Sequence, residues 1–215
     1  MQVHNQRDSA KLETGGALLS DLEILERIVG DENGIFISPV IDPVVQLGPS
    51  SLDLHLGTEL SMTRTMHSTH IDLTLSKEEV KETLARYSAR QRIAPEEFFV
   101  LHPGEFALAS TLEFIRLPRD IAGRLEGRSS IGRLGLQVHA TAGFVDPGFE
   151  GALTFELINA GRLPLKIAPG LRLGQICFFT VKEVQVGYMD KASSKYGGKT
   201  GVEASLIHED PEISG

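Results

Sequence analysis

Residues 149–181 read FEGALTFELINAGRLPLKIAPGLRLGQICFFTV, and this stretch carries the pattern that decides the fold. Short apolar segments alternate in it with the turn signals Asn159-Ala160-Gly161 and Pro169-Gly170. The pattern predicts strands over residues 153–158, 165–167 and 175–181. Cys177 lies between Ile176 and Phe178 in the last of them, and we interpret it as a small core residue.

The same pattern extends towards the N-terminus. It predicts further short strands, separated by Pro and Gly turns, over residues 98–101, 105–110, 112–117, 121–126 and 136–140. Before them, residues 51–57 alternate, with three leucines on one face and Ser51, Asp53 and His55 on the other, as is typical of a half-buried strand. Many short strands at this spacing favour one all-β barrel or sandwich.

Two capping boxes predict helices beside these strands. Ser20 and Glu23 begin a helix whose apolar residues recur at helical spacing up to Gly30. Ser76 and Glu79 begin a second, short surface helix inside the polar stretch 61–97, which we expect to be an insertion. The expected organisation is a flexible leader over residues 1–16, one β domain over 17–186 and a flexible tail over 187–215.

Composition and charge exclude several classes of protein. The 215 residues hold 21 Lys and Arg against 29 Asp and Glu, and a net charge of −8 argues against nucleic-acid or membrane partners. No apolar run approaches the ~20 residues that span a bilayer. The polar N-terminus lacks the apolar segment of a signal peptide, so we expect a cytoplasmic protein. One cysteine excludes a disulfide framework, and His67 with His70 are too few for a metal site.

Residues 127–136, GRSSIGRLGL, place two arginines five positions apart around two serines. Arginine forks, hydroxyls and the free amides of a helical turn all match phosphate oxygens. The alternative interpretation is a surface turn with ordinary solvated arginines. The stretch is therefore a candidate phosphate site.

Two carboxylates follow in or near a second glycine-rich stretch, residues 139–151 (HATAGFVDPGFEG). Asp146 either faces a ligand or caps its own backbone in a hairpin turn. Glu156 falls on the strand face opposite Leu153, Phe155 and Leu157, where it is either solvated or a tuned acid–base group.

Taken together, these motifs resemble the dCTP deaminase and dUTPase superfamily of trimeric nucleotide hydrolases. Residues 127–136, 141–151 and 169–178 resemble its phosphate, sugar–base and second phosphate motifs, and residues 49–57 its N-terminal strand motif. The resemblance covers residues 20–205 apart from the insertion. It implies a mainly β, single-domain distorted barrel of the dUTPase-like (β-clip) kind with a few short helices. It also implies a homotrimer with sites between subunits, dCTP and dUTP as ligands, and Mg²⁺ bound through the triphosphate.

Single positions favour one branch of this superfamily. Glu156 and the form Gly-Arg-Ser-Ser-Ile-Gly-Arg over residues 127–133 resemble the deaminases. Gly143 and Phe144 stand where deaminases that release dUTP usually carry His-Arg, and together with Gln175 they resemble the bifunctional type. That type converts dCTP to dUMP and pyrophosphate and supplies dUMP for thymidylate synthesis. A deaminase that releases dUTP, a dUTPase alone and a non-enzymatic nucleotide-binding trimer remain as alternatives.

The resemblance further implies roles for single residues. Glu156 would shuttle a proton between a water and the cytosine N3 and amino group, while Ser129, Arg133 and the Ala142 backbone place that water and the base. Asp146 would bind the deoxyribose 3′-hydroxyl and help position the water that attacks phosphorus. The residues expected to hold the triphosphate or complete the binding site are Arg128, Ser129, Ser130, Thr154, Phe155, Gln175, Tyr188 and Lys195. Lys199 stands in the tail where the family usually has glutamine.

The cysteine count separates two deamination chemistries. Zinc-dependent nucleobase deaminases need a His/Cys/Cys or three-cysteine cage. Cys177 is the only cysteine of the chain, so any deamination is expected to proceed without zinc. A carboxylate must then take the proton from water, and a partly desolvated Glu156 is the candidate.

Overall fold

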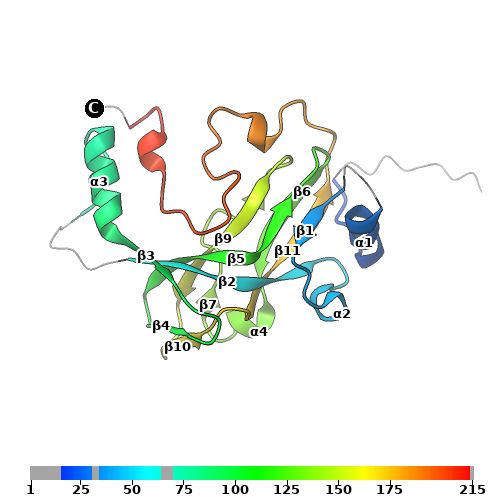
Figure 1. The fold of residues 1–215 in the computed structure, drawn as a ribbon, viewed down its shortest axis with the longest axis horizontal. Helices are drawn as coiled ribbons and strands as arrows, with labels where there is room; N and C mark the ends of the chain where they lie inside the picture. Colours follow the sequence, from blue (N-terminus) through cyan, green and yellow to red (C-terminus); the bar gives the residue numbers. More distant parts are fainter. Residues whose placement is uncertain (1–15, 31–33, 64–69, 214–215) are drawn as a thin grey trace, which may run out of the picture.

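The computed structural model describes residues 16–30, 34–63 and 70–213 (Figure 1). His67 and nearly all of the predicted leader lie outside these residues. The helices are α1 Asp21–Val29, α2 Pro43–Gln46, α3 Lys77–Tyr87 and α4 Ser129–Gly132, with the 3-10 helices η1 Tyr188–Asp190 and η2 Ile207–Glu209. The strands are β1 Phe36–Ser38, β2 Leu52–Thr63, β3 Ser88–Arg92, β4 Phe99–Leu101, β5 Phe106–Arg116, β6 Ile121–Gly127, β7 Leu136–Gln137, β8 Phe144–Val145, β9 Glu150–Asn159, β10 Leu165–Ile167 and β11 Arg172–Thr180. In the described part of the chain, no helix is long and apolar enough to cross a membrane.

One curved antiparallel sheet dominates the molecule. Within the described residues it contains nine strands, in the order β7-β9-β5-β2-β11-β6-β8, with β1 added to β5 and β3 added to β2. The sheet curls over the core, and β4 and β10 form a small second sheet (Figure 1). The predicted mainly β, distorted-barrel architecture is confirmed, in the form of a half-barrel rather than a sandwich.

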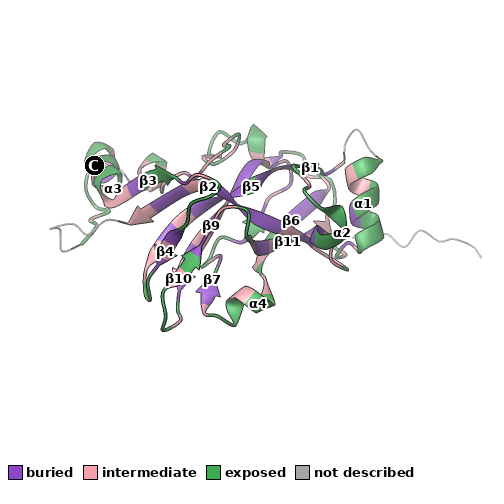
Figure 2. Ribbon diagram, turned by 60° about the horizontal axis from the view of Figure 1, so that its bottom comes forward, coloured by how far each residue is buried: buried purple, intermediate pink, exposed green. Residues whose placement is uncertain are grey.

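The core follows from period-two alternation along the long strands. On β9, Leu153, Phe155 and Leu157 are buried while Thr154 and Glu156 are only half-buried. Figure 2 shows the buried residues running along the central strands, with exposed residues on the helices and turns. Burial of one face of each strand is the main favourable term in such a fold, so this pattern also decides which side chains are left for a site.

Both predicted helices begin at the predicted capping boxes. In α1 the Ser20 hydroxyl accepts from the Glu23 N–H, and the Glu23 carboxylate accepts from the Ser20 N–H at 2.8 Å. Ser76 and Glu79 make the same pair of hydrogen bonds at the start of α3, which is the predicted surface helix of the stretch 61–97.

Several predictions of local structure are corrected. The two strands expected over 105–110 and 112–117 form one strand, β5, with a register shift between Ser110 and Phe114. The strand expected over 136–140 is limited to β7. His55 is buried rather than on a polar face, because it pairs with Glu113 of β5. Cys177 is half-buried on the face of β11 opposite Ile176, not in the core.

Residues 187–213 of the predicted tail follow a defined route across the open side of the sheet. The tail first lies along the turn before β9, where the Tyr188 N–H donates to the Pro147 carbonyl at 2.8 Å. It then lies beside the start of β9, where the Ala152 N–H donates to the Lys199 carbonyl at 2.8 Å. Its last part packs η2 against α3 (Figure 1). The predicted flexibility of the tail and the domain boundaries stay predictions.

Candidate functional site

Glu156 lies on β9 with its carboxylate fixed by backbone donors. Its Oε2 accepts from the N–H groups of Ala140 at 2.7 Å and Thr141 at 3.2 Å. The segment that supplies these donors lies beside β9 because the Glu156 N–H donates to the Val138 carbonyl at 2.9 Å. Among the described residues, Oε1 accepts no hydrogen bond. One oxygen of Glu156 is thus held by protein and the other is left for a ligand or water.

This carboxylate lines a cavity of about 410 Å³. The predicted site residues on its wall are Ala142, Phe144, Asp146, Thr154, Glu156 and Tyr188. The tail adds further lining residues, namely Tyr196, Lys199, Gly201, Glu203, Ala204 and Ser205. Such a mixture of apolar wall and convergent polar groups is typical of a small-ligand site.

Aromatic packing joins the tail to the Asp146 turn. The ring of Tyr188 lies 5.4 Å from the buried ring of Phe149, at 59° between the planes. Gly148 permits this approach, because it has a φ of +76° and an added Cβ would come within 2.8 Å of the Gly187 Cα. A side chain at position 148 would therefore push the tail away from the cavity.

Gly143 sits where the backbone leaves no room for a side chain. Its carbonyl accepts from the Leu125 N–H at 2.7 Å, and an added Cβ would meet the Leu125 carbonyl oxygen at 2.9 Å. Phe144 follows as the first residue of β8, with an exposed side chain on the cavity wall. The Gly-Phe pair thus brings this loop close to β6 while it presents an aromatic ring to the cavity.

The predicted phosphate motif lies in a second, smaller cavity of about 260 Å³. Arg128 is the N-cap residue of α4, and Ser129 and Ser130 form its exposed first turn. Arg128 and Ser129 line the cavity, together with residues of the segment 136–139. Arg133 is the C-cap residue and is exposed. Ser130 and Arg133 do not line this cavity, so the turn brings one hydroxyl, that of Ser129, and the Arg128 side chain to it.

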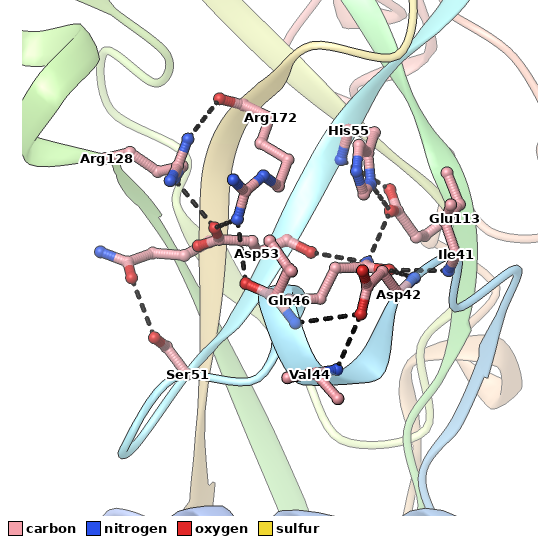
Figure 3. A network of polar contacts seen from close by, with 12 residues as sticks. Ile41, Asp42, Val44, Gln46, Ser51, Asp53, His55, Glu113, Arg128 and Arg172 are labelled. Atoms are coloured by element: carbon pink, nitrogen blue, oxygen red, sulfur yellow. Dashed lines mark hydrogen bonds and ion pairs between the residues drawn. The ribbon is translucent and has the colours of Figure 1, made fainter.

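Asp53 fixes the orientation of Arg128, a contact that the sequence analysis missed (Figure 3). The Asp53 Oδ2 lies 2.9 Å from Nε of Arg128 and 2.9 Å from Nη1 of Arg172. Arg128 Nη1 also donates to the Arg172 carbonyl at 3.0 Å. Strands β2, β11 and β6 are adjacent in the sheet and Arg128 directly follows β6, so these three residues converge although they are far apart in sequence. The signal in the sequence was an aspartate on the polar face of a leucine-rich strand.

Gln175 of β11 is also held by hydrogen bonds, one of them from Ser51, on the polar face of residues 51–57. The Ser51 hydroxyl donates to its Oε1 at 2.9 Å, and its Nε2 donates to the Gly127 carbonyl at 3.2 Å. Gln175 pairs in register with Asp53 on one side and Glu126 on the other. It therefore lies beside the predicted phosphate motif, although it lines neither cavity.

A buried polar network supports the back of this region. Glu113, fully buried, accepts from the His55 N–H at 2.9 Å and lies 2.6 Å from His55 Nδ1. Gln46 of α2 donates to Glu113 at 3.3 Å and to the Asp53 carbonyl at 3.1 Å. Figure 3 shows this network continuing from Asp53 into the core. Buried polar groups are costly unless they are paired, so the network fixes the position of β2.

The single chain does not bring all predicted site residues together. The cavity at Glu156 and the cavity at Arg128 share no lining residue. Lys195 is held within the tail, where its Nζ contacts the Asp210 carboxylate and the Leu206 carbonyl, and the hydrogen bond to Asp210 keeps the pKa of Lys195 above its usual value. The side chain of Phe155 is fully buried in the core, so only its backbone is available to a ligand.

The donor set does not favour a protein-only metal cage. In residues 16–30, 34–63 and 70–213, no group of three or more His, Cys, Asp or Glu side chains is placed to hold a metal ion. The donors at the second cavity, a guanidinium, a hydroxyl and backbone amides, instead suit phosphate oxygens. A divalent cation that arrives with a polyphosphate fits these residues, since the phosphates supply its ligands.

Comparisons with known proteins give the family of the chain. The family model described as dCTP deaminase-like matches residues 18–181. A dCTP deaminase of Natronomonas pharaonis is 41% identical over 199 residues, which cover 92% of this chain and 98% of that protein. Proteins named "dCTP deaminase, dUMP-forming" are 41% identical over 200 residues in Methanosphaera stadtmanae (92% of this chain, 97% of that protein) and 42% identical over 197 in Parafrankia sp. (90% and 92%).

A solved structure gives the same result for the fold. The 2′-deoxycytidine 5′-triphosphate deaminase from Agrobacterium tumefaciens superposes with a TM-score of 0.57 at 26% identity. The match covers 76% of this chain and 46% of that one, so the chain spans about half the length of that structure. The family match and the relatives above 40% identity extend over most of the sequence, and the chain belongs to the dCTP deaminase-like family.

Proposed function

We propose that this protein removes the amino group of dCTP by hydrolysis without zinc, and then hydrolyses the resulting dUTP to dUMP and pyrophosphate. The observation that carries the proposal is the placement of Glu156. Its carboxylate lines the cavity with Oε2 held by two backbone N–H groups and Oε1 left without a partner among the described residues. A group so fixed is oriented for proton transfer at a single oxygen.

In the deamination step, Glu156 takes a proton from the water that attacks the cytosine C4. It returns this proton to N3, which leaves a hydroxyl and the amino group on C4. Glu156 then takes the hydroxyl proton and passes it to the amino group, and the C4–N bond breaks as the carbonyl forms and ammonia leaves. Ser129, Arg133 and the Ala142 backbone are the groups proposed to place the water and the base. The single cysteine supports a route that does not depend on the cysteine-based zinc cage.

The second step, to dUMP, is supported by Gly143, Phe144 and Asp146. Gly143 occupies a position with no room for the side chain that dUTP-releasing deaminases usually carry there. Asp146 lines the same cavity as Glu156, where it would bind the 3′-hydroxyl and orient the water that attacks phosphorus. The relatives of Methanosphaera stadtmanae and Parafrankia sp., at 41% and 42% identity, are named dUMP-forming, in agreement with this step.

Arg128, Ser129, Ser130 and Gln175 are the groups proposed to bind the triphosphate, with Tyr188 and Lys195 from the tail. Mg²⁺ would be bound through the phosphate oxygens and would neutralise part of their charge. The division of the predicted residues between two cavities supports sites assembled between subunits of a homotrimer. A cytoplasmic location is part of the same proposal.

The substitution Glu156→Gln tests the proposal. Because it removes the proton acceptor but keeps the size of the side chain, ammonia release from dCTP should fall at least about a hundredfold while dCTP still binds. Glu150→Gln, on the same strand but outside both cavities, is the matched control and should retain activity. Full deamination by the Glu156→Gln variant would remove Glu156 from the mechanism.

A further inference from the structure

The stretch that carries α3 and β3 has no part in the chemistry described above, yet the tail ends on it. The strand β3 pairs with the outer end of β2, and Glu59 of β2 lies opposite Arg92 in that pairing. Arg90 of β3 and Glu59 form an ion pair, with Nε and Oε2 3.5 Å apart. Both members of this ion pair form hydrogen bonds with one residue of the tail, Val202.

Both backbone polar groups of Val202 are bound by this pair. The Val202 N–H donates to the Glu59 Oε2 at 3.3 Å, and Arg90 Nη2 donates to the Val202 carbonyl. Arg90 Nη2 also lies 3.3 Å from Oε1 of Glu203, the next residue. One ion pair therefore holds the tail through both the N–H and the carbonyl of Val202. We name Glu59 and Arg90 the tail clamp.

Burial explains why the clamp is more than a surface ion pair. Val202 is only 1% exposed, and buried backbone groups without partners are strongly unfavourable. The side chains of Arg90 and Glu59 are 53% and 33% exposed, so their mutual attraction alone contributes little. The clamp acts mainly through its hydrogen bonds to the buried backbone of Val202.

Gly201 gives independent evidence for the same contact. An added Cβ at this position would lie 2.0 Å from the Glu59 Oε2 and 2.6 Å from its Cδ. The carboxylate is thus packed directly on the Gly201 Cα, and any larger residue displaces it. The close approach depends on glycine at this one position of the tail.

The position of the clamp links it to the cavity. Gly201 and Glu203, on both sides of Val202, line the cavity that contains Glu156, as do Lys199, Ala204 and Ser205. Earlier in the tail, Tyr188 packs on Phe149, and the Gly198 N–H donates to the Glu150 carbonyl at 2.7 Å. The clamp is the contact that fixes the tail to the strands β2 and β3 beyond these points.

We propose that Glu59 and Arg90 are positioning residues for the nucleotide, and that the strand β3 serves to dock the tail. They hold the tail at Val202, and the neighbouring tail residues that line the cavity are thereby kept in position to contact the bound nucleotide. The proposal rests on the proposed function, because it assigns the tail to the nucleotide site. Loss of the clamp should weaken binding of substrate and transition state equally, which raises KM without lowering kcat.

The test compares Arg90→Ala and Gly201→Ala with Arg92→Ala. Arg92 carries the same charge two residues along β3 and makes no ion pair with any described residue, so it is the matched control. We expect both clamp variants to raise the KM for dCTP about tenfold with kcat within about twofold, and the control to match wild type. Arg90→Lys, which keeps one donor for the Val202 carbonyl, should fall between.

Limited trypsin digestion at Lys199 gives a readout that does not depend on activity. The clamp variants should be cut there faster than wild type and Arg92→Ala, with unchanged melting temperatures. Unchanged digestion and KM in both variants would overturn the clamp, and faster digestion with unchanged KM would overturn its effect on the nucleotide. If wild type turns over no dCTP, the proposed function fails, whereas faster digestion of both variants still supports the tail contact.

Discussion

Asp53 of β2 illustrates how one carboxylate holds two arginines, one on β11 and one directly after β6. It accepts from Arg128 and Arg172 at 2.9 Å each, while its own backbone carbonyl is bound by Gln46. Arginine orientation matters at a phosphate site because the guanidinium fork binds oxygens in a fixed plane. The alternation of residues 51–57 predicts that Asp53 lies on a polar face, but its partners depend on the register of β2, β11 and β6.

The variant Asp53→Asn tests this role. It keeps the shape of the side chain but removes the charge that orients Arg128, so the KM for dCTP should rise about tenfold. Asp120→Asn, which removes the carboxylate of the Arg27–Asp120 ion pair outside both cavities, is the control. An unchanged KM in the Asp53→Asn enzyme would mean that Arg128 is oriented without this carboxylate.

Cys177 offers a second test at the scale of the residue. Burial raises the pKa of its thiol above the usual value, and the neighbouring Glu126 carboxylate acts in the same direction. The thiolate is the reactive form, so Cys177 should react with a disulfide reagent at pH 7.5 several times more slowly than a free thiol. Denaturant should abolish the difference. A folded protein that reacts as fast as a free thiol would contradict the raised pKa of Cys177.

Among the elements, the ones with local signals were predicted best. The capping boxes at Ser20 and Ser76 mark where α1 and α3 begin, and β10 has the predicted bounds. The expected break in β5 was wrong for a reason outside the local sequence. Thr111 donates to the Glu113 carbonyl and accepts from the Leu153 N–H, and these contacts accommodate an irregularity within one continuous strand.

The buried pair between β2 and β5 allows a prediction at this scale. Glu113→Ala removes the acceptor of the His55 N–H and one of the two acceptors of Gln46, so the free energy of unfolding should fall by about 3 kcal/mol. Urea denaturation measures this change. Glu96→Ala, at an exposed position, should stay within about 0.5 kcal/mol of wild type. A change as small in Glu113→Ala would show that the network does not stabilise β2.

The whole molecule brings the predicted site residues to two places rather than one. Glu156, Asp146 and Phe144 line one cavity, and Arg128 and Ser129 line the other. The motif sequences predicted the turns on which these residues lie, while their roles in a site stay predictions. The route of the tail could not be predicted, since it depends on the distant contacts of Tyr188 with Phe149 and of Val202 with the tail clamp.

Subunit mixing tests whether the two cavities combine between chains. Arg128→Ala and Glu156→Gln should each be inactive alone. Unfolded together and refolded at equal amounts, they should regain about a quarter of the wild-type activity, because that share of sites in a cyclic trimer pairs the two intact halves. Refolding each variant alone is the control, and a mixture as inactive as its components would place the whole site within one chain.

Product analysis with dCTP and Mg²⁺ tests the central claim most directly. Purified protein, treated with a zinc chelator and then supplied with Mg²⁺, is incubated with dCTP, and ammonia, pyrophosphate and nucleotides are followed together by chromatography. We expect ammonia and pyrophosphate in equal amounts, with dUMP as the nucleotide product. Ammonia with dUTP as the end product would contradict the second step, and the absence of ammonia would contradict the account as a whole.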